Sequence, residues 1–298
     1  MHGARTGVSP LNTPLPPTVD LHLHSTASDG NLPAETVVER AAAAGLSAIA
    51  LTDHDTLGGV AAAVAAGERL GVRVVGGCEF SCAAPWGEMH VLGYFLPESS
   101  AALDAFLAGC RADRVRRARA MVDKLRRLGV DLTFDDVQQV SAGAAMGRPH
   151  VARALVNKGA ATDLSNAFDR YLGRGRPGFV DKVLPTFREV ARVAHSVGGV
   201  VSAAHLKDRA SRTVLERFRN EGLDALEVRH PSHSPEVRER LAQFANELGL
   251  LQTGGSDWHG ETAAEGDHGT IGSQQVPLEW LEALERRTDG QTARRLDG

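Results

Sequence analysis

Short apolar strands alternate with alanine-rich helices along most of the chain, and this alternation limits the folds open to it. Examples are TVDLHLHS followed by PAETVVERAAAAG, and LSAIALTDHD followed by LGGVAAAVAAGERLG. Helices that connect successive strands carry the chain back across the sheet, so such strands run parallel. Seven candidate strands, mostly joined by helices, therefore favour an α/β fold in the form of a parallel β/α barrel over an antiparallel sandwich.

One long segment, residues 97–185, interrupts this alternation and has mostly helical patterns. A structureless loop of this length is uncommon in a compact domain. We therefore expect a small helical cap that stands over one rim of a barrel built from residues 18–96 and 186–287. The proline-rich residues 1–17 are expected to form a flexible arm, and residues 288–298 a frayed tail.

Composition restricts the class of protein. A chain of 298 residues with 42% hydrophobic residues can bury a full core, and a net charge of −4 argues against coating duplex DNA. The odd number of cysteines, Cys78, Cys82 and Cys110, is not typical of a disulfide framework. No apolar run is long enough to span a bilayer, and the first residues lack the apolar core of a signal peptide. We expect a soluble cytoplasmic protein with no membrane partner.

Histidines and carboxylates gather at the ends of the expected strands. His22 and His24 are two residues apart in an extended segment, so their imidazoles project from the same face. Glu79 is expected to close the third strand, and His90 to open a fourth that forms an antiparallel hairpin with it. Because the carboxyl ends of parallel barrel strands share one rim, such residues converge there. The candidate metal ligands are His22, His24, Asp29, His54, Glu79, His90, His205, Asp257 and His259.

These six histidines and three carboxylates offer nitrogen and oxygen ligands, which suit Mn, Fe or Zn and do not suit a thiolate site or a calcium cage. Nine ligands exceed the needs of one ion. Two or three divalent ions that share a carboxylate would use them all, and Glu79 is the best candidate for the bridge. The alternative for any single member is a histidine satisfied within the core, but this does not account for a whole set at strand ends.

The segments DLHLHSTASDG, LTDHDT, GCEFS, EMHVLGY, AAHL and GSDWH resemble, in order, the motifs of the PHP (polymerase and histidinol phosphatase) metal-dependent phosphoesterases. The resemblance extends over residues 18–285 and is greater to the TrpH-like branch, which includes nucleoside 3′,5′-bisphosphate phosphatases and the 5′-to-3′ exoribonuclease RNase AM. It implies a distorted seven-stranded (β/α)7 barrel with a trinuclear centre, commonly of Mn. It also implies the ligands of each ion: His22, His24, Glu79 and Asp257 for the first; Glu79, His90 and His205 for the second; Asp29, His54 and His259 for the third.

Two residues depart from the family pattern. Leu206 follows His205 where the family usually has Pro, and Trp258 stands where Phe is more usual. Neither change removes a ligand, although Leu206 is expected to alter its loop.

The insertion supplies candidates for substrate binding. Arg148 in GRPH, with His150 beside it, is similar to a branch motif near the substrate phosphate, and Lys182 falls where that branch has a substrate-facing polar residue. A guanidinium fork suits a terminal phosphate because two N–H groups meet two oxygens. The alternative is that Arg148 pairs with an acid on a neighbouring helix.

Other polar residues have weaker assignments. The run RADRVRRARAMVDKLRR is expected to be mostly a solvated helix face, from which Arg114 or Arg117 can reach the cleft. His233 is expected either to contact substrate or to cap its loop. His195 in a helix and His268 in a GDHG turn are expected to be structural.

The chemistry expected of this site is phosphate ester hydrolysis, because bound divalent ions activate water and neutralise phosphoryl oxygens. Our hypothesis is removal of the 3′-phosphate from a nucleoside 3′,5′-bisphosphate, with Arg148 holding the 5′-phosphate. The same site would act on short 5′-phosphorylated RNA from its 5′ end. Alternatives are a histidinol-phosphate phosphatase and a non-catalytic metal-binding module. The leaving group is stabilised by a third ion or by one of two histidines, and the residues expected to take part in catalysis are Glu79, His205, Asp257 and His259.

Overall fold

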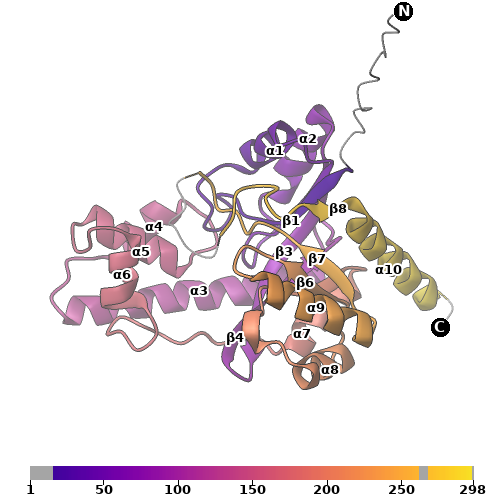
Figure 1. Ribbon diagram of the computed structural model, residues 1–298. Coiled ribbons are helices and arrows are strands. Elements are labelled where there is room, and N and C mark those ends of the chain that lie inside the picture. Colours follow the sequence, from indigo (N-terminus) through magenta and orange to yellow (C-terminus); the bar gives the residue numbers. More distant parts are fainter. Residues whose placement is uncertain (1–15, 262–267, 297–298) are drawn as a thin grey trace, which may run out of the picture.

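The computed structural model describes residues 16–261 and 268–296 (Figure 1). A single sheet of eight strands has the order β7-β6-β5-β4-β3-β2-β1-β8. Its strands are β1 (Thr18–Leu23), β2 (Ala48–Leu51), β3 (Arg73–Ala84), β4 (Gly87–Tyr94), β5 (Val200–Ala203), β6 (Ala225–Arg229), β7 (Leu251–Gly254) and β8 (Val276–Pro277). The predicted α/β barrel is confirmed, but with one strand more than predicted. The extra strand is β8, which pairs antiparallel with β1. It has only two residues, which are too few for a recognisable sequence pattern.

Strand β4 is antiparallel to both of its neighbours, β3 and β5, whereas β1, β2 and β3 run parallel, as do β5, β6 and β7. The hairpin of β3 with β4 agrees with the prediction. Glu79, however, does not close its strand, because β3 continues to Ala84. The antiparallel partner pairs with β3 as far as Ala84 and Gly87, so the strand is supported beyond the rim. Glu79 therefore lies mid-strand, where it forms a parallel bridge with His54.

The segment after β7 brings the two ends of the sheet together at the carboxyl rim. The N–H of Asp257 donates to the carbonyl of His22 at 2.9 Å, and the N–H of His24 donates to the carbonyl of Trp258 at 3.0 Å. Trp258 also forms a parallel bridge with Leu23 and is buried in the apolar cluster around that strand. The sheet is therefore nearly closed into a barrel, and its seam passes through the residues expected to bind metal.

Six helices cover the outside of the barrel: α1 (Ala34–Ala43), α2 (Val60–Leu70), α7 (Phe187–Ser196), α8 (Arg212–Asn220), α9 (Pro235–Leu248) and α10 (Leu278–Leu296). The five helices that are shorter than α10 are amphipathic. In α7, for example, the buried residues have the spacing of one helix face: Phe187, Val190, Ala191 and Ala194. The frayed tail expected from residue 288 is instead helical to Leu296. The helix is anchored by Leu281 and Leu284, which are buried against the barrel.

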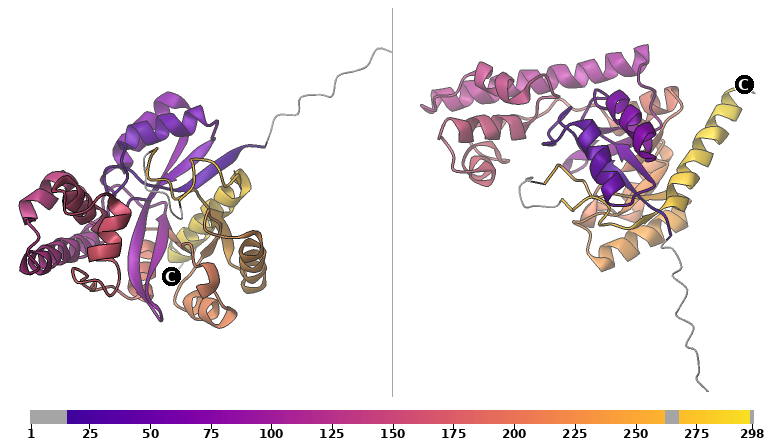
Figure 2. Two further views of the ribbon diagram at one scale, coloured as in Figure 1. Left: turned by 60° about the vertical axis from the view of Figure 1, so that its left-hand side comes forward. Right: turned by 90° about the horizontal axis from the view of Figure 1, so that it is seen from above.

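Residues 97–185 contain α3 (Ala101–Arg127), α4 (Phe134–Ser141), α5 (Arg148–Asn157), α6 (Leu164–Ala167) and the π-helix η1 (Phe168–Leu172). These helices stand to one side of the barrel (Figure 2). They have an apolar cluster of their own, which includes Met121, Leu125 and Leu155. The first half of α3 instead packs on the barrel through Leu103 and Leu107. One long helix thus joins two separately packed units.

Most of the arm expected over residues 1–17 lies outside the described residues. None of the helices in the described part of the chain is both long enough and apolar enough to cross a membrane.

The separate cluster of the cap should behave as a packed core. Leu155 is fully buried in it, so Leu155→Ala should lower the free energy of unfolding by about 2–5 kcal/mol through lost burial and a residual cavity. Leu128→Ala is the control, because Leu128 is 55% exposed and its loss should change stability by less than about 0.5 kcal/mol. Denaturant unfolding measures both, and equal effects would show that the cap helices are not packed as described.

Candidate metal centre

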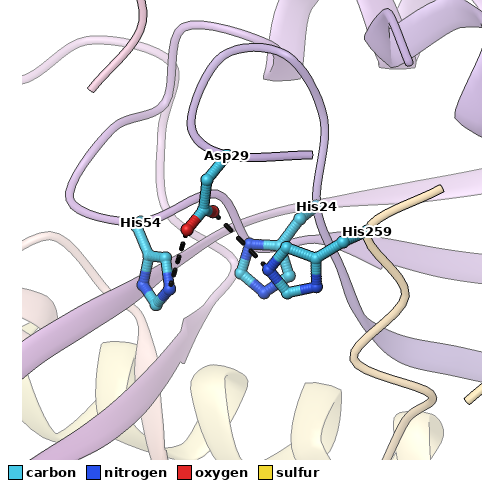
Figure 3. A group of neighbouring side chains, drawn as sticks. All are labelled: His24, Asp29, His54 and His259. Carbon is cyan, nitrogen blue, oxygen red and sulfur yellow. Dashed lines mark ion pairs between the residues drawn. The ribbon is translucent and has the colours of Figure 1, made fainter. Parts of the chain in front are cut away.

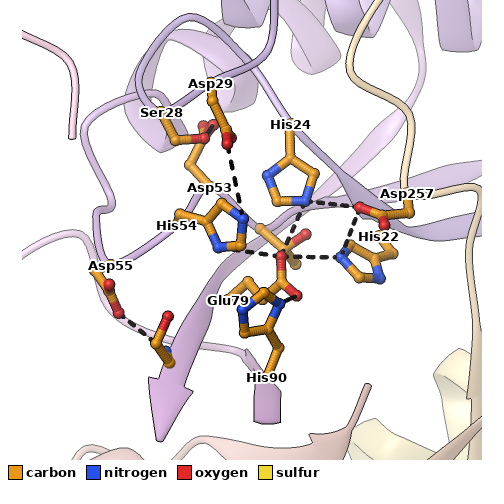
Figure 4. Close-up of polar contacts among 12 residues, drawn as sticks. His22, His24, Ser28, Asp29, Asp53, His54, Asp55, Glu79, His90 and Asp257 are labelled. Atoms are coloured by element: carbon orange, nitrogen blue, oxygen red, sulfur yellow. Dashed lines mark hydrogen bonds and ion pairs between the residues drawn. The ribbon is translucent and has the colours of Figure 1, made fainter. Parts of the chain in front are cut away.

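The carboxylate of Glu79 lies at the middle of the candidate ligands (Figure 4). Its Oε2 atom is 3.2 Å from His22 Nε2, 3.1 Å from His24 Nε2 and 3.3 Å from His54 Nδ1. The local fold determines the positions of these histidines. His22 and His24 project from the same face at the end of β1, and His54 follows β2. Glu79 itself is 1% exposed, so this contact is made in a buried environment.

The second oxygen of Glu79 faces two further histidines. Oε1 lies 2.7 Å from His90 Nδ1, on β4, and 3.0 Å from His205 Nε2, just after β5. His205 has a φ of 30°, which a non-glycine residue rarely adopts. The two oxygens of Glu79 therefore face two groups of imidazoles, as a carboxylate that bridges two ions would.

Asp257 completes the first of these groups. Its Oδ1 atom lies 3.2 Å from His22 Nε2 and 3.1 Å from His24 Nε2, so His22, His24, Glu79 and Asp257 converge on one point. Asp257 also has a left-handed backbone, with a φ of 53°.

A third group surrounds Asp29, in the loop after β1 (Figure 3). Asp29 Oδ1 lies 3.5 Å from His259 Nε2, and Oδ2 lies 4.0 Å from His54 Nε2. His24 joins these residues, because its ring stacks on that of His259 with centroids 4.1 Å apart. His24, Asp29, His54 and His259 have side-chain atoms close enough to hold one ion.

Several of these atoms are buried and have no hydrogen-bond partner, although they are short distances from one another. They are His22 Nε2, His24 Nδ1 and Nε2, Asp29 Oδ1, His54 Nδ1 and Glu79 Oε2. Burial of a polar atom without a hydrogen-bond partner costs free energy, so these atoms require another partner. Two ligand atoms that are each about 2.0–2.2 Å from one ion, at right angles to each other, lie about 3 Å apart. The spacings around Glu79 match that distance. The residues therefore fit divalent metal ions bound by imidazole and carboxylate.

The electrostatics of the centre fit the same conclusion. Burial opposes ionisation of Glu79, Asp29 and Asp257, but the surrounding histidines hold the pKa of each carboxyl well below its usual value. Burial opposes protonation of the histidines, yet the carboxylates raise the pKa of His24 to about 10 and that of His90 to about 9. Without metal, protons thus occupy positions that ions would take.

Three polar residues that were not predicted to be part of the centre also lie there. Glu227 Oε1 is 2.9 Å from His22 Nδ1, and His230 Nε2 is 3.3 Å from Asp257 Oδ2. His268 was expected to have only a structural role in the GDHG turn, but it lies 3.1 Å from the same oxygen of Asp257. A sequence signal existed for Glu227, an acid within the apolar strand ALEVR, and for His230 at the end of that strand. Nothing in the sequence indicates the position of His268.

A cavity of about 640 Å³ lies between the rim and the cap. On the rim side it is lined by candidate ligands, including His54, Glu79 and His259, together with His268. On the cap side it is lined by residues of α5 and η1, including Arg153 and Phe168, of which Arg153 was not predicted.

A second cavity of about 410 Å³ adjoins the first, and both are lined by His90, His205 and Arg209. Its polar walls are mostly cationic. The basic side chains that line it are Arg117, Arg148, Arg174, Lys182 and Arg209, and the acidic ones are Glu88 and Asp181. This composition suits an anion next to the metal centre.

Three of the predicted substrate-binding residues line this second cavity. Arg148 is half-buried, with its guanidinium carbon 5.8 Å from the ring centroid of Phe168. Arg117 is buried and donates from Nε to the carbonyl of Val180 at 3.1 Å. Lys182 pairs with Glu88 and donates to Ser81 Oγ at 3.0 Å, so it is already engaged in the protein.

The other three candidates are engaged elsewhere and line neither cavity. Arg114 forms a buried ion pair with Asp55, with Nε 2.6 Å from Oδ2, which attaches α3 to the loop after β2. His150 accepts a hydrogen bond from the N–H of Gly147 at the start of α5. His233 is 3.0 Å from the carbonyl of Val228 and accepts from the N–H of Lys207, which corresponds to the loop-capping alternative.

Leu206, one of the two residues that depart from the family pattern, has a φ of −64°. Proline fixes φ near −65°, so Leu206 adopts the backbone that a proline would impose. Its side chain is buried in the barrel cluster. The change from Pro to Leu is therefore compatible with the position of His205.

The chain is similar to known proteins along most of its length. The family model of the PHP domain matches residues 20–248. A 3′,5′-nucleoside bisphosphate phosphatase from Chromobacterium violaceum is 36% identical over 249 residues, which are 81% of this chain and 87% of that protein. The 5′-3′ exoribonuclease Rnm from Escherichia coli is 32% identical over 247 residues, which are 80% of this chain and 84% of that enzyme.

A solved structure from Bifidobacterium adolescentis, described as a metal-dependent phosphoesterase, superposes with a TM-score of 0.83 and 33% sequence identity. The match covers 91% of this chain and 97% of that one. The barrel and the cap are thus both shared with it.

Metal binding should release protons. His24 and His90, with pKa values of about 10 and about 9, are protonated at pH 7.5 without metal, and so is His22, because the surrounding carboxylates overcome its burial and hold its pKa well above the usual value. Each must lose a proton to become a ligand, so titration of metal-free protein with Mn²⁺ at pH 7.5 should release about three protons per chain. Calorimetry in buffers of different ionisation enthalpy measures this number, and apparent affinity should fall as pH is lowered. Binding without proton release would contradict this description of the imidazoles.

Proposed function

The chain belongs to the PHP domain family, and on that premise we propose that it is a metal-dependent phosphoesterase that removes the 3′-phosphate of nucleoside 3′,5′-bisphosphates. The name of the Chromobacterium violaceum relative supports this substrate, and the name of the Escherichia coli relative supports a related action on RNA from the 5′ end.

The observation that carries the proposal is the joining of two cavities with different chemistry. The larger is lined by seven of the nine candidate metal ligands, and the smaller is lined by arginines and few acids. They meet at His90, His205 and Arg209. A nucleoside bisphosphate has two anionic groups separated by a ribose, so one phosphate can reach the metal centre while the other lies among the arginines.

The proposal includes two or three divalent ions, with Mn as the first metal to test. His22, His24, Glu79 and Asp257 would hold the first, Glu79, His90 and His205 the second, and Asp29, His54 and His259 the third. When bound, such ions activate water for attack on phosphorus and neutralise the phosphoryl oxygens.

The side chains of the protein have distinct tasks in this reaction. Glu79 holds two groups of imidazoles at a fixed separation, and Asp257 fixes the first group at the seam of the barrel. His205 and His259 both line the larger cavity. The departing 3′-oxygen would be stabilised by the third ion, or protonated by whichever of these two histidines is not bound to an ion. Arg148 offers a guanidinium fork to the 5′-phosphate, which orients the ester bond toward the centre.

The two alternatives fit less well. Histidinol phosphate has one phosphate and an ammonium group, and the cations of the smaller cavity would repel that ammonium. A non-catalytic module would be expected to lack ligands, whereas all nine gather at one rim.

Phosphate release from 3′-phosphoadenosine 5′-phosphate with added Mn²⁺ tests the proposal. Arg148→Ala should lower kcat/KM about 10- to 100-fold, because a hydrogen-bonded charge pair with the 5′-phosphate is lost. The same variant should have little effect on adenosine 3′-monophosphate, which lacks that phosphate.

Arg127→Ala is the matched control, because Arg127 is exposed on α3 and lines neither cavity. It should leave both activities unchanged. Faster release from histidinol phosphate than from either nucleotide would instead assign the chain to the other substrate class.

A further inference from the structure

Strand β6 supplies no proposed metal ligand, yet it brings two buried polar side chains to the metal centre. Glu227 lies on the strand and is 0% exposed, and His230 follows it and is 1% exposed. Burial of a carboxylate and an imidazole is costly unless each has partners. Their partners here are residues of the proposed centre.

Glu227 determines which nitrogen of His22 can bind metal. Glu227 Oε1 lies 2.9 Å from His22 Nδ1, and since a carboxylate accepts hydrogen bonds, the proton of the neutral imidazole is on Nδ1. The lone pair is then on Nε2, which lies 3.2 Å from both Glu79 Oε2 and Asp257 Oδ1. Nε2 has no hydrogen-bond partner of its own.

The other oxygen of Glu227 holds the backbone of a second ligand. Oε2 accepts a hydrogen bond of 2.7 Å from the N–H of His205. His205 needs this support because its φ of 30° is strained for a residue with a Cβ atom. One carboxylate thus fixes His22 in the first group of ligands and His205 in the second.

His230 has its own tautomer fixed by its loop. The N–H of Ser232 donates to His230 Nδ1 at 3.1 Å, so Nδ1 is the acceptor and the proton of the neutral ring is on Nε2. That N–H lies 3.3 Å from Asp257 Oδ2, while Asp257 Oδ1 faces His22 and His24. His230 therefore holds the carboxylate by the oxygen that does not face the first group.

We propose that Glu227 and His230 are positioning residues that orient His22, His205 and Asp257 and thereby set the affinity of the centre for divalent ions. This inference rests on the metal centre of the proposed function. The rival is a further ion held by His22, Glu227 and His230, which have atoms within 4.8 Å of one another. The geometry disfavours it, because His22 Nδ1 is already bonded to Glu227 and His230 Nε2 carries a proton.

The first test compares the parent with Glu227→Gln. A glutamine has the same size, but it cannot accept from both His22 and His205, so either the tautomer of His22 or the loop of His205 is lost. Competition with a metal chelator should show Mn²⁺ affinity lowered about 10- to 100-fold, the usual cost of removing such a partner. Metal analysis at saturating Mn²⁺ should still give the ion count of the parent.

The second test uses two variants of His230. His230→Gln retains an N–H donor for Asp257 and should keep most of the affinity, whereas His230→Leu removes the donor and should weaken binding as Glu227→Gln does. Recovery by the conservative variant is not expected if His230 only fills space.

Asp224→Asn is the matched control for loss of a buried carboxylate. Asp224 is also buried and close to β6, but it accepts from the N–H of Val201 at 3.0 Å and lies 2.7 Å from His195 Nε2, away from the centre. It should lower the thermal stability of the metal-free protein and leave Mn²⁺ affinity unchanged.

Two outcomes would overturn the inference. Parental affinity in Glu227→Gln and His230→Leu would show that both residues are merely structural, and a lower ion count at saturation would show that they are ligands. If the parent itself bound no Mn²⁺, the proposed function would fail first, so the two failures are distinguishable.

Discussion

The structure depends on one buried carboxylate, that of Glu79, which has five imidazole nitrogens within 3.3 Å. They come from the ends of β1, β2 and β5 and from within β4, so the register of nearly the whole sheet is required to bring them together. A shift of one residue in any of these strands would turn its histidine to the other face. The antiparallel strand β4 is part of this constraint, because it places His90 opposite Ser81, two residues beyond Glu79.

Three of the seven non-glycine residues with positive φ in the described part of the chain lie at the same centre. Asp55, His205 and Asp257 all have positive φ, and each is a proposed ligand or the neighbour of one. A left-handed residue with a Cβ atom costs on the order of 1–3 kcal/mol and persists only when its surroundings determine it. Here the surroundings are specific: Asp55 pairs with Arg114, His205 donates to Glu227, and Asp257 donates to His22. Because Asp55 follows His54, the cap is attached directly beside the centre.

The sequence was sufficient to predict the barrel and the set of residues that meets at its rim. The barrel follows from the spacing of apolar residues along the chain, and the set of residues follows from the rim that parallel strands share. It was not sufficient for β8, which is too short to have a period, or for the length of β3, which depends on its partner strand. The roles of Arg114 and His150 were also beyond it, and for His233 it left two roles open. Each is determined by a partner distant in the chain or by one backbone atom, and basic or imidazole residues look alike in sequence whether or not they reach a cleft.

The division of the molecule into two packed units matches a division of charge. The barrel contributes imidazoles and carboxylates, which attract cations, and the insertion contributes Arg117, Arg148, Arg174 and Lys182, which attract anions. With a net charge of −4, the chain as a whole does not favour an anionic substrate, so attraction must come from this local arrangement. The distance between the two units then determines which substrates can contact both of them at once. Since the long helix α3 packs on the barrel at one end and in the cap at the other, that spacing is fixed by a rigid element and not by a loop.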